Sequence, residues 1–433
     1  MVIHTVQSGE NIYSIARIYN VPPSRIITDN QLQDPGRLVA GQTLVILFPT
    51  ETYTVRGGDT LSSISAEIGV PILTLYRNNP QLAGKPVIYP GQILNIAYET
   101  PPLGSIRTNG YAYSYIDRDV LRQTLPYLTY LSIFSYGLGE DGSLVLPSGG
   151  DEDLIAIARE YGTVPLMMLT SLTENGTFSS DLANTVLTTP ALRDSIIQNT
   201  VDTVIAKGYG GVDIDFEYIP ASASEAFAEF IRMMRMALPF GYVVFASLAP
   251  KYSADQPGLL YEGHDYRAVG EAADFVLLMT YEWGYTYGPP MAVSPIPNVR
   301  RVIEYALTEI PAEKLFIGYP NYGYDWPLPF VRGETKAQSL SNVAAVARAG
   351  QRNAAIEYDE QAQAPFYNYF DRPETYSDAV EHEVWFQDAR SADAMLRLVE
   401  EYGLTGVSVW NIMRYFPSLW LVVNALYSIE KLL

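Results

Sequence analysis

Eight short apolar runs recur along residues 107–433, and most are separated by segments whose apolar residues have helical spacing. The runs are Gly110–Tyr113, Tyr130–Tyr136, Pro165–Thr170, Gly211–Glu217, Val243–Leu248, Phe275–Tyr281, Leu315–Pro320 and Gly406–Trp410. Strands that alternate with helices favour a parallel sheet, and eight such units are typical of a closed barrel. The sequence therefore predicts the α/β class, with a (β/α)8 TIM barrel in this part of the chain.

The stretch between the last two runs is much longer than one crossover helix requires, since it extends from Tyr322 to Tyr402. We expect a small α+β insertion at about residues 325–388, between the seventh and eighth strands. Because an insertion there follows the C-terminal end of a barrel strand, it should form a wall of the cleft at that end.

The first hundred residues contain an internal repeat. Val6–Ile12 recurs as Val55–Leu61, and Gly41–Ile46 recurs as Gly91–Ile96. Each unit has the pattern strand, helix, helix, strand, and a pair of consecutive prolines follows the second unit. We therefore expect two modules at 1–48 and 49–98, a linker at 99–106 and the barrel at 107–433.

The repeat is similar to the LysM module, because the second unit contains Val-x-x-Gly-Asp-Thr-Leu, a later Asn and Pro-Gly-Gln. This resemblance implies a βααβ fold that grips glycans containing N-acetylglucosamine in a shallow groove. The groove residues that it implies are Gly58, Asp59, Thr60, Leu61 and Asn79 in the second unit, and Gly9, Glu10, Asn11, Ile12 and Asn30 in the first. Asp, Asn and Thr are also good N-caps, so these residues are expected to cap the first helix in either case. Glu10–Asn11 replaces the usual Asp-Thr, which makes the first unit the weaker candidate for binding.

The composition excludes several classes of function. A formal net charge of −20 argues against nucleic acid and anionic membranes, which would need clustered Lys and Arg. No stretch reaches the roughly 18 apolar residues of a spanning helix. Cysteine is absent and the three histidines, His4, His264 and His382, are far apart in the sequence, so we expect neither a metal nor a cofactor. The 33 tyrosines and five tryptophans offer rings that can stack on sugars, and a monomer that binds a glycan is expected.

The fourth run places three carboxylates at alternate positions. Asp213, Asp215 and Glu217 would share one face of a strand, and the apolar residues between them would cover the other face. Carboxylates that lie close together in a partly dry site cannot all ionise freely, so at least one pKa should rise and keep a proton near neutrality. A general acid needs such a proton. The run therefore predicts an acid catalyst near the C-terminal end of a barrel strand, where barrel enzymes place their catalytic groups.

The same run resembles the Asp-x-Asp-x-Glu strand of the family 18 glycoside hydrolases. The likeness extends over residues 107–433 and includes Leu278–Tyr281, Gly318–Gly323 and Gly406–Trp410. It implies hydrolysis with retention, in which the 2-acetamido oxygen of the substrate, and no enzyme nucleophile, attacks the anomeric carbon. Such enzymes are exceptions to the usual two-carboxylate scheme.

The resemblance also implies a role for each site residue. Glu217 would protonate the departing oxygen and then activate water, Asp215 would hold the acetamido N–H, and Asp213 would tune the pKa of Asp215. Tyr281 would hydrogen-bond the acetamido oxygen and Trp410 would form the floor under the sugar, although ordinary packing is the alternative for both rings. Further sugar-binding residues are expected at Met279, Glu282, Trp283, Tyr111, Asn321 and Tyr322.

Two positions depart from the family pattern. Gly210 stands three residues before Asp213, where the family often has an Asp, and this change could shift the pKa values of the carboxylates. Glu282 follows Tyr281 where an Asp is usual, so its contact with the sugar should differ.

Three further segments, Tyr281–Tyr285, Gly288–Ala292 and His382–Phe386, resemble the spore-germination branch of the family, which comprises cortical-fragment-lytic enzymes with two LysM modules. This resemblance implies an N-acetylglucosaminidase of spore-cortex peptidoglycan that resides in the spore coat, cortex or cell wall. The chain begins without a recognisable signal peptide, which fits such a protein or a leader missing from this sequence. Two alternatives stay open, a chitinase acting on chitin oligomers and a catalytically silent glycan-binding lectin. The retained Glu217 disfavours the lectin, and the scarcity of histidine disfavours a metal-dependent deacetylase.

Overall fold

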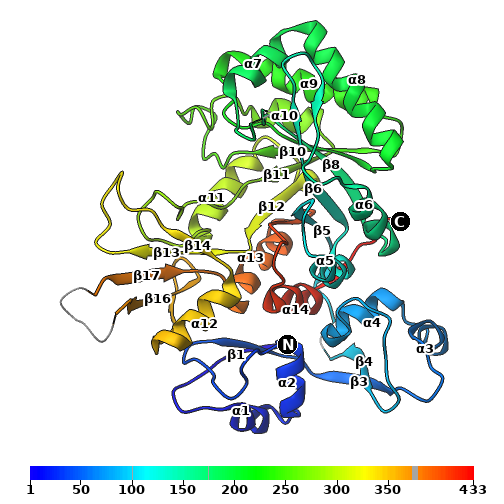
Figure 1. Ribbon diagram of the computed structural model, residues 1–433, viewed down its shortest axis with the longest axis vertical. Coiled ribbons are helices and arrows are strands. Elements are labelled where there is room, and N and C mark those ends of the chain that lie inside the picture. The colour runs from blue at the N-terminus through cyan, green and yellow to red at the C-terminus, as the bar shows by residue number, and fades with distance from the viewer. Residues whose placement is uncertain (100, 174, 373–378) are drawn as a thin grey trace.

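Eight parallel strands form a closed barrel in the computed structural model of the protein (Figure 1). The structure describes residues 1–99, 101–173, 175–372 and 379–433, so Thr100 of the expected linker and residues 373–378 of the expected insertion lie outside the described residues. The barrel strands are β5 (Gly104–Tyr113), β6 (Tyr130–Leu138), β8 (Val164–Thr170), β9 (Gly211–Asp215), β10 (Val243–Leu248), β11 (Phe275–Leu278), β12 (Leu315–Pro320) and β18 (Gly406–Trp410). Because β5 pairs with both β18 and β6, the sheet closes on itself, and the predicted (β/α)8 barrel is confirmed.

Two of the predicted strands end earlier than the sequence pattern suggested. β9 ends at Asp215 and β11 at Leu278, so Glu217 and Tyr281 lie in the loops that follow. Tyr218 and Glu282 come directly after them and take left-handed backbone conformations, with φ values of 59° and 67°. The strand alternation of the carboxylates therefore includes Asp213 and Asp215 but stops before Glu217, which corrects the expectation of one shared strand face.

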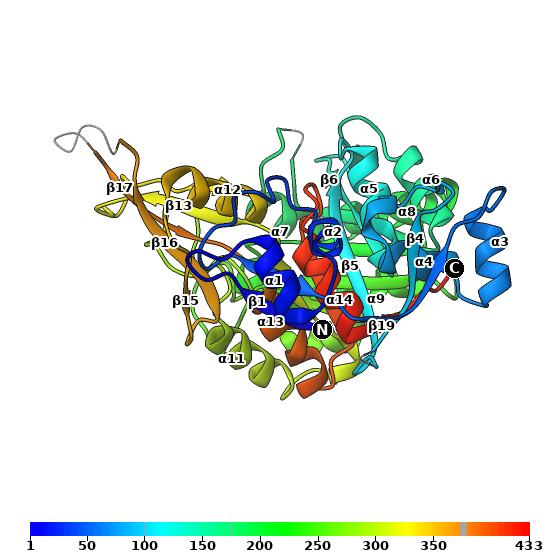
Figure 2. The ribbon, with the colours of Figure 1, turned by 90° about the horizontal axis from the view of Figure 1, so that it is seen from below.

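Helices surround the barrel and bury their apolar faces against it (Figures 1 and 2). They include α5 (Arg118–Thr124), α6 (Glu152–Glu160), α7 (Ser180–Thr188), α8 (Pro190–Lys207), α9 (Ser224–Ala237), α10 (Tyr266–Ala272), α11 (Ile296–Ala306), α13 (Ala389–Glu401) and α14 (Pro417–Leu426). Inside the barrel, the ring of Phe245 lies 5.1 Å from that of Tyr130 and 5.2 Å from that of Phe316. These aromatic rings fill the barrel interior, so it is a packed core and not a pore. Among the described residues, no helix combines the length and the apolar character that crossing a membrane requires.

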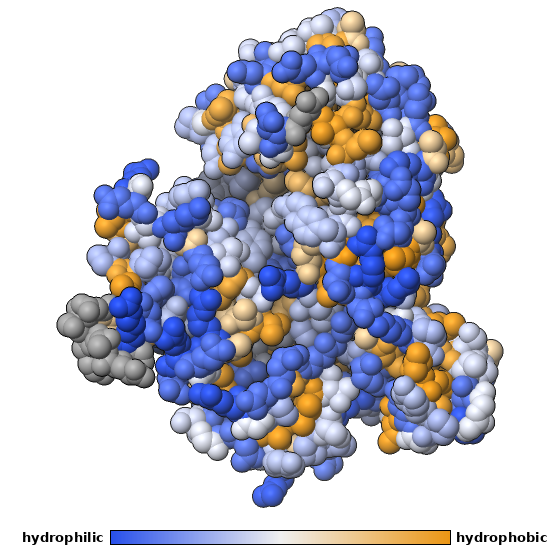
Figure 3. All heavy atoms as spheres, in the orientation of Figure 1, coloured by the Kyte–Doolittle hydropathy of each residue, from blue (hydrophilic) through white to orange (hydrophobic). Residues whose placement is uncertain are grey.

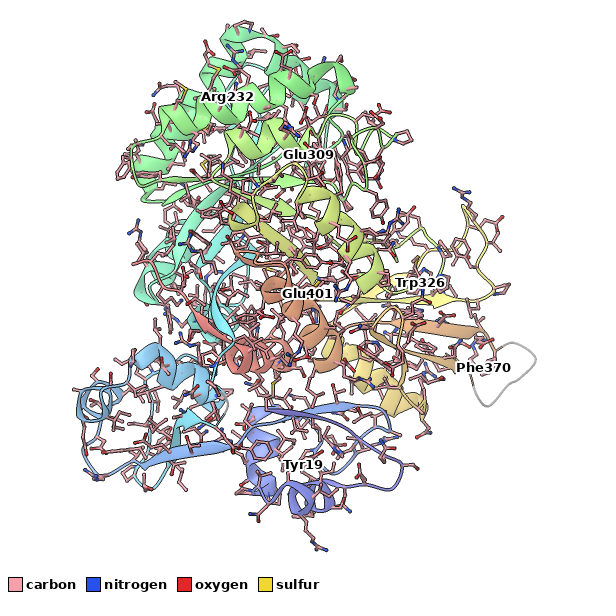
Figure 4. All side chains as sticks on the ribbon, turned by 180° about the vertical axis from the view of Figure 1, so that it is seen from behind. Tyr19, Arg232, Glu309, Trp326, Phe370 and Glu401 are labelled. Carbon is pink, nitrogen blue, oxygen red and sulfur yellow. The ribbon has the colours of Figure 1, made fainter. Side chains whose placement is uncertain are left out.

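An α+β insertion separates β12 from β18, as predicted. Its elements are β13 (Gly323–Pro327), β14 (Gln338–Leu340), α12 (Asn342–Arg352), β15 (Glu357–Asp359), β16 (Ala364–Phe370) and β17 (Glu381–Trp385). The five strands form an antiparallel sheet, and α12 packs Ala345 and Ala349 against it. Figure 4 shows Trp326 of β13 near the barrel and Phe370 at the far end of β16. The buried Trp326 packs against Ala292 and Val293, which joins the insertion to the loop after β11.

Two βααβ modules precede the barrel. Module 1 comprises β1 (Val2–Thr5), α1 (Ile12–Tyr19), α2 (Pro23–Asp29) and β2 (Thr43–Ile46), and module 2 comprises β3 (Pro49–Thr54), α3 (Leu61–Ile68), α4 (Ile72–Asn78) and β4 (Ile93–Tyr98). Asn11 and Thr60 each form a capping box at the start of the first helix of their module. The expected capping of these helices is therefore present in both modules.

Both modules dock on the remainder of the chain, below the barrel in Figure 1. In module 1, the carbonyl of Ala40 accepts a hydrogen bond from the Ile356 N–H at 2.8 Å, and Arg37 donates to the Gly350 carbonyl at 2.7 Å. Gly41 has a φ of 84°, and a Cβ at that position would lie 1.8 Å from the Ile356 oxygen. In module 2, the carbonyl of Gly84 accepts a hydrogen bond from the Tyr161 hydroxyl at 2.6 Å. Module 1 is thus attached to the insertion and module 2 to the barrel.

Candidate active site

A cavity of about 630 Å³ lies at the C-terminal ends of the barrel strands. Figure 3 shows the surface hollowed between the barrel and the insertion. One wall is aromatic, since the ring of Trp410 lies 5.4 Å from that of Tyr111 and 5.5 Å from that of Phe134. Aromatic walls beside carboxylates are suited to hold a sugar, because its apolar faces stack on rings while its hydroxyls find polar partners.

The cavity brings together eight of the residues that were predicted from the sequence. They are Tyr111, Asp215, Glu217, Met279, Tyr281, Glu282, Trp283 and Trp410. Asp213 is fully buried and is not part of the lining. Asn321 and Tyr322 line a second, adjoining cavity, which also contains Glu282 and Trp410.

Asp213 is held by a short chain of polar groups inside the barrel. The Ser132 hydroxyl donates to Asp213 Oδ2 at 2.7 Å, and the Asn109 amide donates to the Ser132 oxygen at 3.0 Å. Burial raises the pKa of Asp213 to about 6, although the hydroxyls of Ser132, Tyr111 and Ser247 act to lower it. The hydroxyls of Tyr111 and Ser247 make no hydrogen bond of ordinary geometry within the described residues. Ser132 is therefore the main support of this carboxylate.

Asp215 lies between the other two carboxylates of the run. Its pKa is raised well above the ordinary value, first by burial and then by the charges of Glu217 and Asp213. Its Oδ1 is buried and has no hydrogen-bond partner among the described residues. A buried acceptor of this kind is suited to receive an N–H donor from a ligand.

Glu217 keeps a proton near neutrality, because burial and then the charge of Glu282 raise its pKa to about 7. The residue before it is anchored in the outer layer of the barrel. The ring of Phe216 stacks on those of Phe227 and Phe230 of α9, at 5.9 and 5.4 Å. Its carbonyl accepts a hydrogen bond from His264 Nε2 at 3.0 Å. The predicted rise in carboxyl pKa is confirmed, and the acid lies on a turn that is fixed from behind.

His264 is buried and its two ring nitrogens have distinct roles. Nδ1 accepts a hydrogen bond from the Ala249 N–H at 2.9 Å, so the proton of the neutral ring lies on Nε2, which donates to Phe216. Burial lowers the pKa of His264 to about 4. The ring therefore stays neutral and serves as a fixed donor over the neutral pH range.

Glu282 lines the cavity where a shorter Asp is usual in the family. Its carboxylate accepts hydrogen bonds from the hydroxyls of Tyr322, in the loop between β12 and β13, and Tyr324 of β13. Burial raises its pKa, and these two hydroxyls oppose the rise. The longer side chain thus reaches two tyrosines at the junction with the insertion.

Gly210, the other departure from the family pattern, is explained by its neighbour on β8. Its N–H donates to the Pro165 carbonyl at 2.8 Å, at the start of β9. A Cβ at this position would lie 2.3 Å from Val164 Cγ1. Val164 therefore fills the space into which an aspartate side chain would extend.

Two of the predicted sugar-binding residues use their polar groups within the protein. Asn321 is almost fully buried and donates to the carbonyls of Asn411 and Arg414, both at 2.9 Å. Trp283 donates from its ring nitrogen to the Tyr252 hydroxyl at 2.7 Å. Asn321 therefore fixes the loop after β18, and a sugar contact of either residue stays a prediction.

Sequence reasoning missed several residues of the site. Ser132 and Ser247 contribute to the environment of Asp213, Tyr324 holds Glu282, and the remaining lining includes Tyr113, Phe134, Phe178, Tyr218, Tyr261 and Tyr285. The two serines could have been found from the sequence, since each is a polar residue within an apolar run that was predicted to be a barrel strand. The aromatic lining carried none, because Tyr and Phe occur throughout the chain.

The LysM residues divide into surface and interior positions. Gly9, Asn11, Gly58 and Thr60 are exposed, Glu10 and Asp59 are partly buried, and Ile12 and Leu61 belong to the module cores. Asn30 and Asn79 are buried, and each accepts a hydrogen bond from a backbone N–H of the second strand, that of Val45 and that of Asn95. Both amides also donate to backbone carbonyls. These asparagines tie each module together, and glycan binding by all ten residues stays a prediction.

Comparison with known proteins places this architecture in a family. Residues 127–414 match the model of the glycosyl hydrolases family 18, and residues 4–47 and 53–97 match that of the LysM domain. The cortical fragment-lytic enzyme of Bacillus anthracis is 38% identical over 439 residues, which cover 99% of each chain. That of Bacillus subtilis (strain 168) is 39% identical and covers 100% of this chain and 99% of its own.

A solved structure agrees with the sequence comparison. The crystal structure of the Bacillus cereus spore cortex-lytic enzyme SleL matches with a TM-score of 0.83 and 37% identity, over 99% of this chain and 98% of that chain. The chain is therefore a glycosidase of family 18 with two LysM domains, and it belongs to the group that includes the cortical fragment-lytic enzymes.

Proposed function

We propose that this protein is an N-acetylglucosaminidase that hydrolyses the peptidoglycan of the spore cortex with retention of configuration. The relatives named above are described as acting on the cortex or its fragments. The LysM domains are expected to bind the same N-acetylated glycan. The single observation that carries the chemistry is that Glu217 and Asp215 line one cavity, where burial and neighbouring carboxylates raise the pKa of both side chains.

In the first step, protonated Glu217 donates its proton to the departing glycosidic oxygen. With a pKa of about 7, roughly half of the molecules carry this proton at neutral pH. The acetamido oxygen of the substrate attacks the anomeric carbon as the bond to the departing oxygen breaks, so no enzyme group becomes covalently bound. The buried, unpartnered oxygen of Asp215 accepts the acetamido N–H, and the ionised form of this carboxyl group offsets the positive charge that develops on the ring.

In the second step, deprotonated Glu217 removes a proton from water, and the water oxygen attacks the anomeric carbon from the side that the leaving group vacated. This attack restores the acetamido group and returns the proton to Glu217. Tyr281 borders the same cavity, and the charge of Asp215 is the largest influence on its pKa after burial. We assign its hydroxyl to the acetamido oxygen, and the ring of Trp410 to the floor under that sugar.

The test is Glu217→Gln, which keeps the shape of the side chain and removes the transferable proton. The rate of cleavage of purified cortex fragments should fall by about 10²–10⁴-fold, the range for loss of a general acid. Binding of the same fragments should persist. The control is Glu225→Gln on the outer helix α9. It makes the same change of side chain at an exposed position and should leave the rate unchanged.

Two outcomes would contradict the proposal. Substantial hydrolysis by Glu217→Gln would exclude this residue as the acid. If the wild-type protein bound N-acetylated glycans and cleaved none, the lectin alternative would hold instead. Mass spectrometry of the new reducing ends, on cortex fragments and on chitin oligomers in parallel, distinguishes the glucosaminidase from the chitinase.

A further inference from the structure

Three cavities follow one another from Glu217 to module 1. The first is the 630 Å³ cavity that contains Glu217. It shares Glu282 and Trp410 with a second cavity of about 420 Å³, beside the insertion. The second shares Ser341, Met413 and Arg414 with a third, of about 670 Å³. Because each neighbouring pair shares lining residues, the three cavities lie side by side from the barrel towards module 1, and we call this row of cavities the path.

The third cavity is bounded by module 1 on one side and by α12 on the other. Residues 30–34 of module 1 line it, and Val343, Val346 and Ala347 of α12 face them. This wall is fixed in position, since module 1 docks on the insertion through Arg37 and Ala40. A chain molecule that leaves the first cavity along this path therefore reaches residues 30–34 of module 1, which begin at Asn30, one of the residues for which the LysM resemblance implies glycan binding.

Arg414 lies where the second and third cavities meet. It is exposed, its backbone carbonyl is held by Asn321, and its guanidinium forms no ion pair or hydrogen bond within the described residues. The other arginine in the path, Arg37, donates to Gly350 and Asn353. Among the acidic residues that line the second and third cavities, Asp388 pairs with Arg390 at 2.7 Å and Glu282 is held by two tyrosines. Asp34 of module 1 is exposed and forms no ion pair within the described residues. Arg414 is thus an available cation in a protein with a net charge of −20.

We propose that the path binds a carboxylate-bearing N-acetylated glycan strand, and that Arg414 binds one of its carboxylates. This inference rests on the proposed function and specifies its substrate. Peptidoglycan alternates N-acetylglucosamine with a sugar that bears a lactyl ether. Where the lactyl group is not closed into a neutral lactam, a carboxylate is present on that group or on a peptide attached to it. A guanidinium matches a carboxylate through two parallel hydrogen bonds, whereas a neutral chitin strand offers it no such partner.

The first experiment measures binding in the Glu217→Gln background, so that cleavage does not interfere. The ligands are peptide-free cortex oligosaccharides, the same oligosaccharides with the lactyl carboxyl converted to its methylamide, oligosaccharides with peptides, and chitin oligomers of equal length. Arg414→Gln should raise the Kd for the carboxylate-bearing ligands about tenfold and leave the neutral ligands unchanged. The loss should shrink at high salt because the site is exposed.

Arg232→Gln is the matched control, since Arg232 lies on α9 at the opposite end of the molecule from module 1 (Figure 4). A loss confined to the peptide-free ligand assigns the carboxylate to the lactyl group, and a loss confined to the peptide-bearing ligand assigns it to the peptide. An equal change for neutral and charged ligands, or no change for any, overturns the inference. If the Glu217→Gln parent bound none of the four ligands, this result would instead count against the proposed function.

The second experiment tests the path itself. Ala347 is exposed on α12 and lines the third cavity, so Ala347→Trp should obstruct it without disturbing the core. Long oligosaccharides should bind about tenfold more weakly, whereas fragments short enough to fill only the first cavity should bind as before. Ala191→Trp on the exposed start of α8 is the control. Unchanged binding of long oligosaccharides would show that the strand does not follow this path.

Discussion

The carboxylate of Glu282 acts on Glu217 across the cavity and, after burial, is the cause that raises the pKa of Glu217 to about 7. The hydroxyls of Tyr322 and Tyr324 hold that carboxylate in place. Residues at the junction with the insertion therefore influence the protonation of Glu217, which lines the same cavity.

The pH dependence of the reaction should report this relationship. In the proposed mechanism the proton-carrying form of Glu217 is the active one, so kcat/KM should fall as the pH rises through about 7. Glu282→Gln removes a negative charge that raises the pKa of Glu217, so the basic limb should move to lower pH. Glu225→Gln should leave it in place. A basic limb that is unaffected by Glu282→Gln, or a rate still rising above about pH 9, would contradict Glu217 as the acid.

Stability should depend on Ser132 in a pH-dependent way. The pKa of Asp213 in the folded protein, about 6, is above that of an ordinary carboxyl, so its contribution to stability is complete at low pH and is lost as the pH rises through 6. Ser132→Ala removes the donor to the charged form and raises this pKa further. The free energy of unfolding should fall by about 1–3 kcal/mol at pH 8 and by less at pH 5, measured by urea denaturation.

Ser247→Ala is the matched control, because Ser247 is equally buried but its hydroxyl has no hydrogen-bond partner among the described residues. Its loss should be smaller and should vary less with pH. Equal losses for the two variants would show that the Ser132 hydrogen bond does not support Asp213.

The docking of module 1 can be tested with one methyl group. Gly41→Ala would place a Cβ against the Ile356 carbonyl, so the module should loosen from the insertion and the Ile356 N–H should exchange with solvent faster. Gly91→Ala is the equivalent change in module 2, with the same φ of 84° and no atom within 4 Å of the added Cβ. It should show only the backbone cost, about 1 kcal/mol. Similar exchange at Ile356 in both variants would contradict the docking.

His264 should make the protein sensitive to acid. Its pKa in the folded state, about 4, is below the ordinary value, so the unfolded chain binds a proton first and stability is lost as the pH falls from about 6.5 towards 4. Relative to His264→Phe, the wild-type protein should lose about 1.4 kcal/mol per pH unit in this range. The variant should also lower kcat, because Phe216 loses its hydrogen bond. A stability difference that is independent of pH would show that His264 has the same pKa in the folded and unfolded protein, which would contradict its burial as a neutral ring.

The fold was largely predictable, and the discrepancies have a physical cause. The bounds of β10, β12 and β18 coincide with the predicted runs. In these three strands the stretch of apolar residues stops where the loop begins. β9 was predicted two residues too long because Phe216 continues the apolar alternation. Phe216 is buried against α9 and not within the sheet pairing, and periodicity alone does not distinguish these environments.

The candidate site was predictable where it depends on motif spacing, and not where it depends on register between strands. Asp215, Glu217 and Tyr281 line one cavity because each lies at the C-terminal end of a barrel strand or in the loop that follows it. The contact between Ser132 and Asp213 joins residues 81 positions apart, on strands that are not adjacent in the sheet. Gly210 is likewise explained only by Val164 on the neighbouring strand.

The anchoring of Phe216 behind the acid separates two kinds of evolutionary change. Substitutions in the insertion or in the loop after β11 can alter which glycan fits, while Glu217 stays on the same rigid turn. Substitutions in the layer of α9 and His264 can inactivate the protein while every residue of the cavity wall is retained. A catalogue of intact cavity residues is therefore insufficient to distinguish an active member of this group from one that has lost its chemistry.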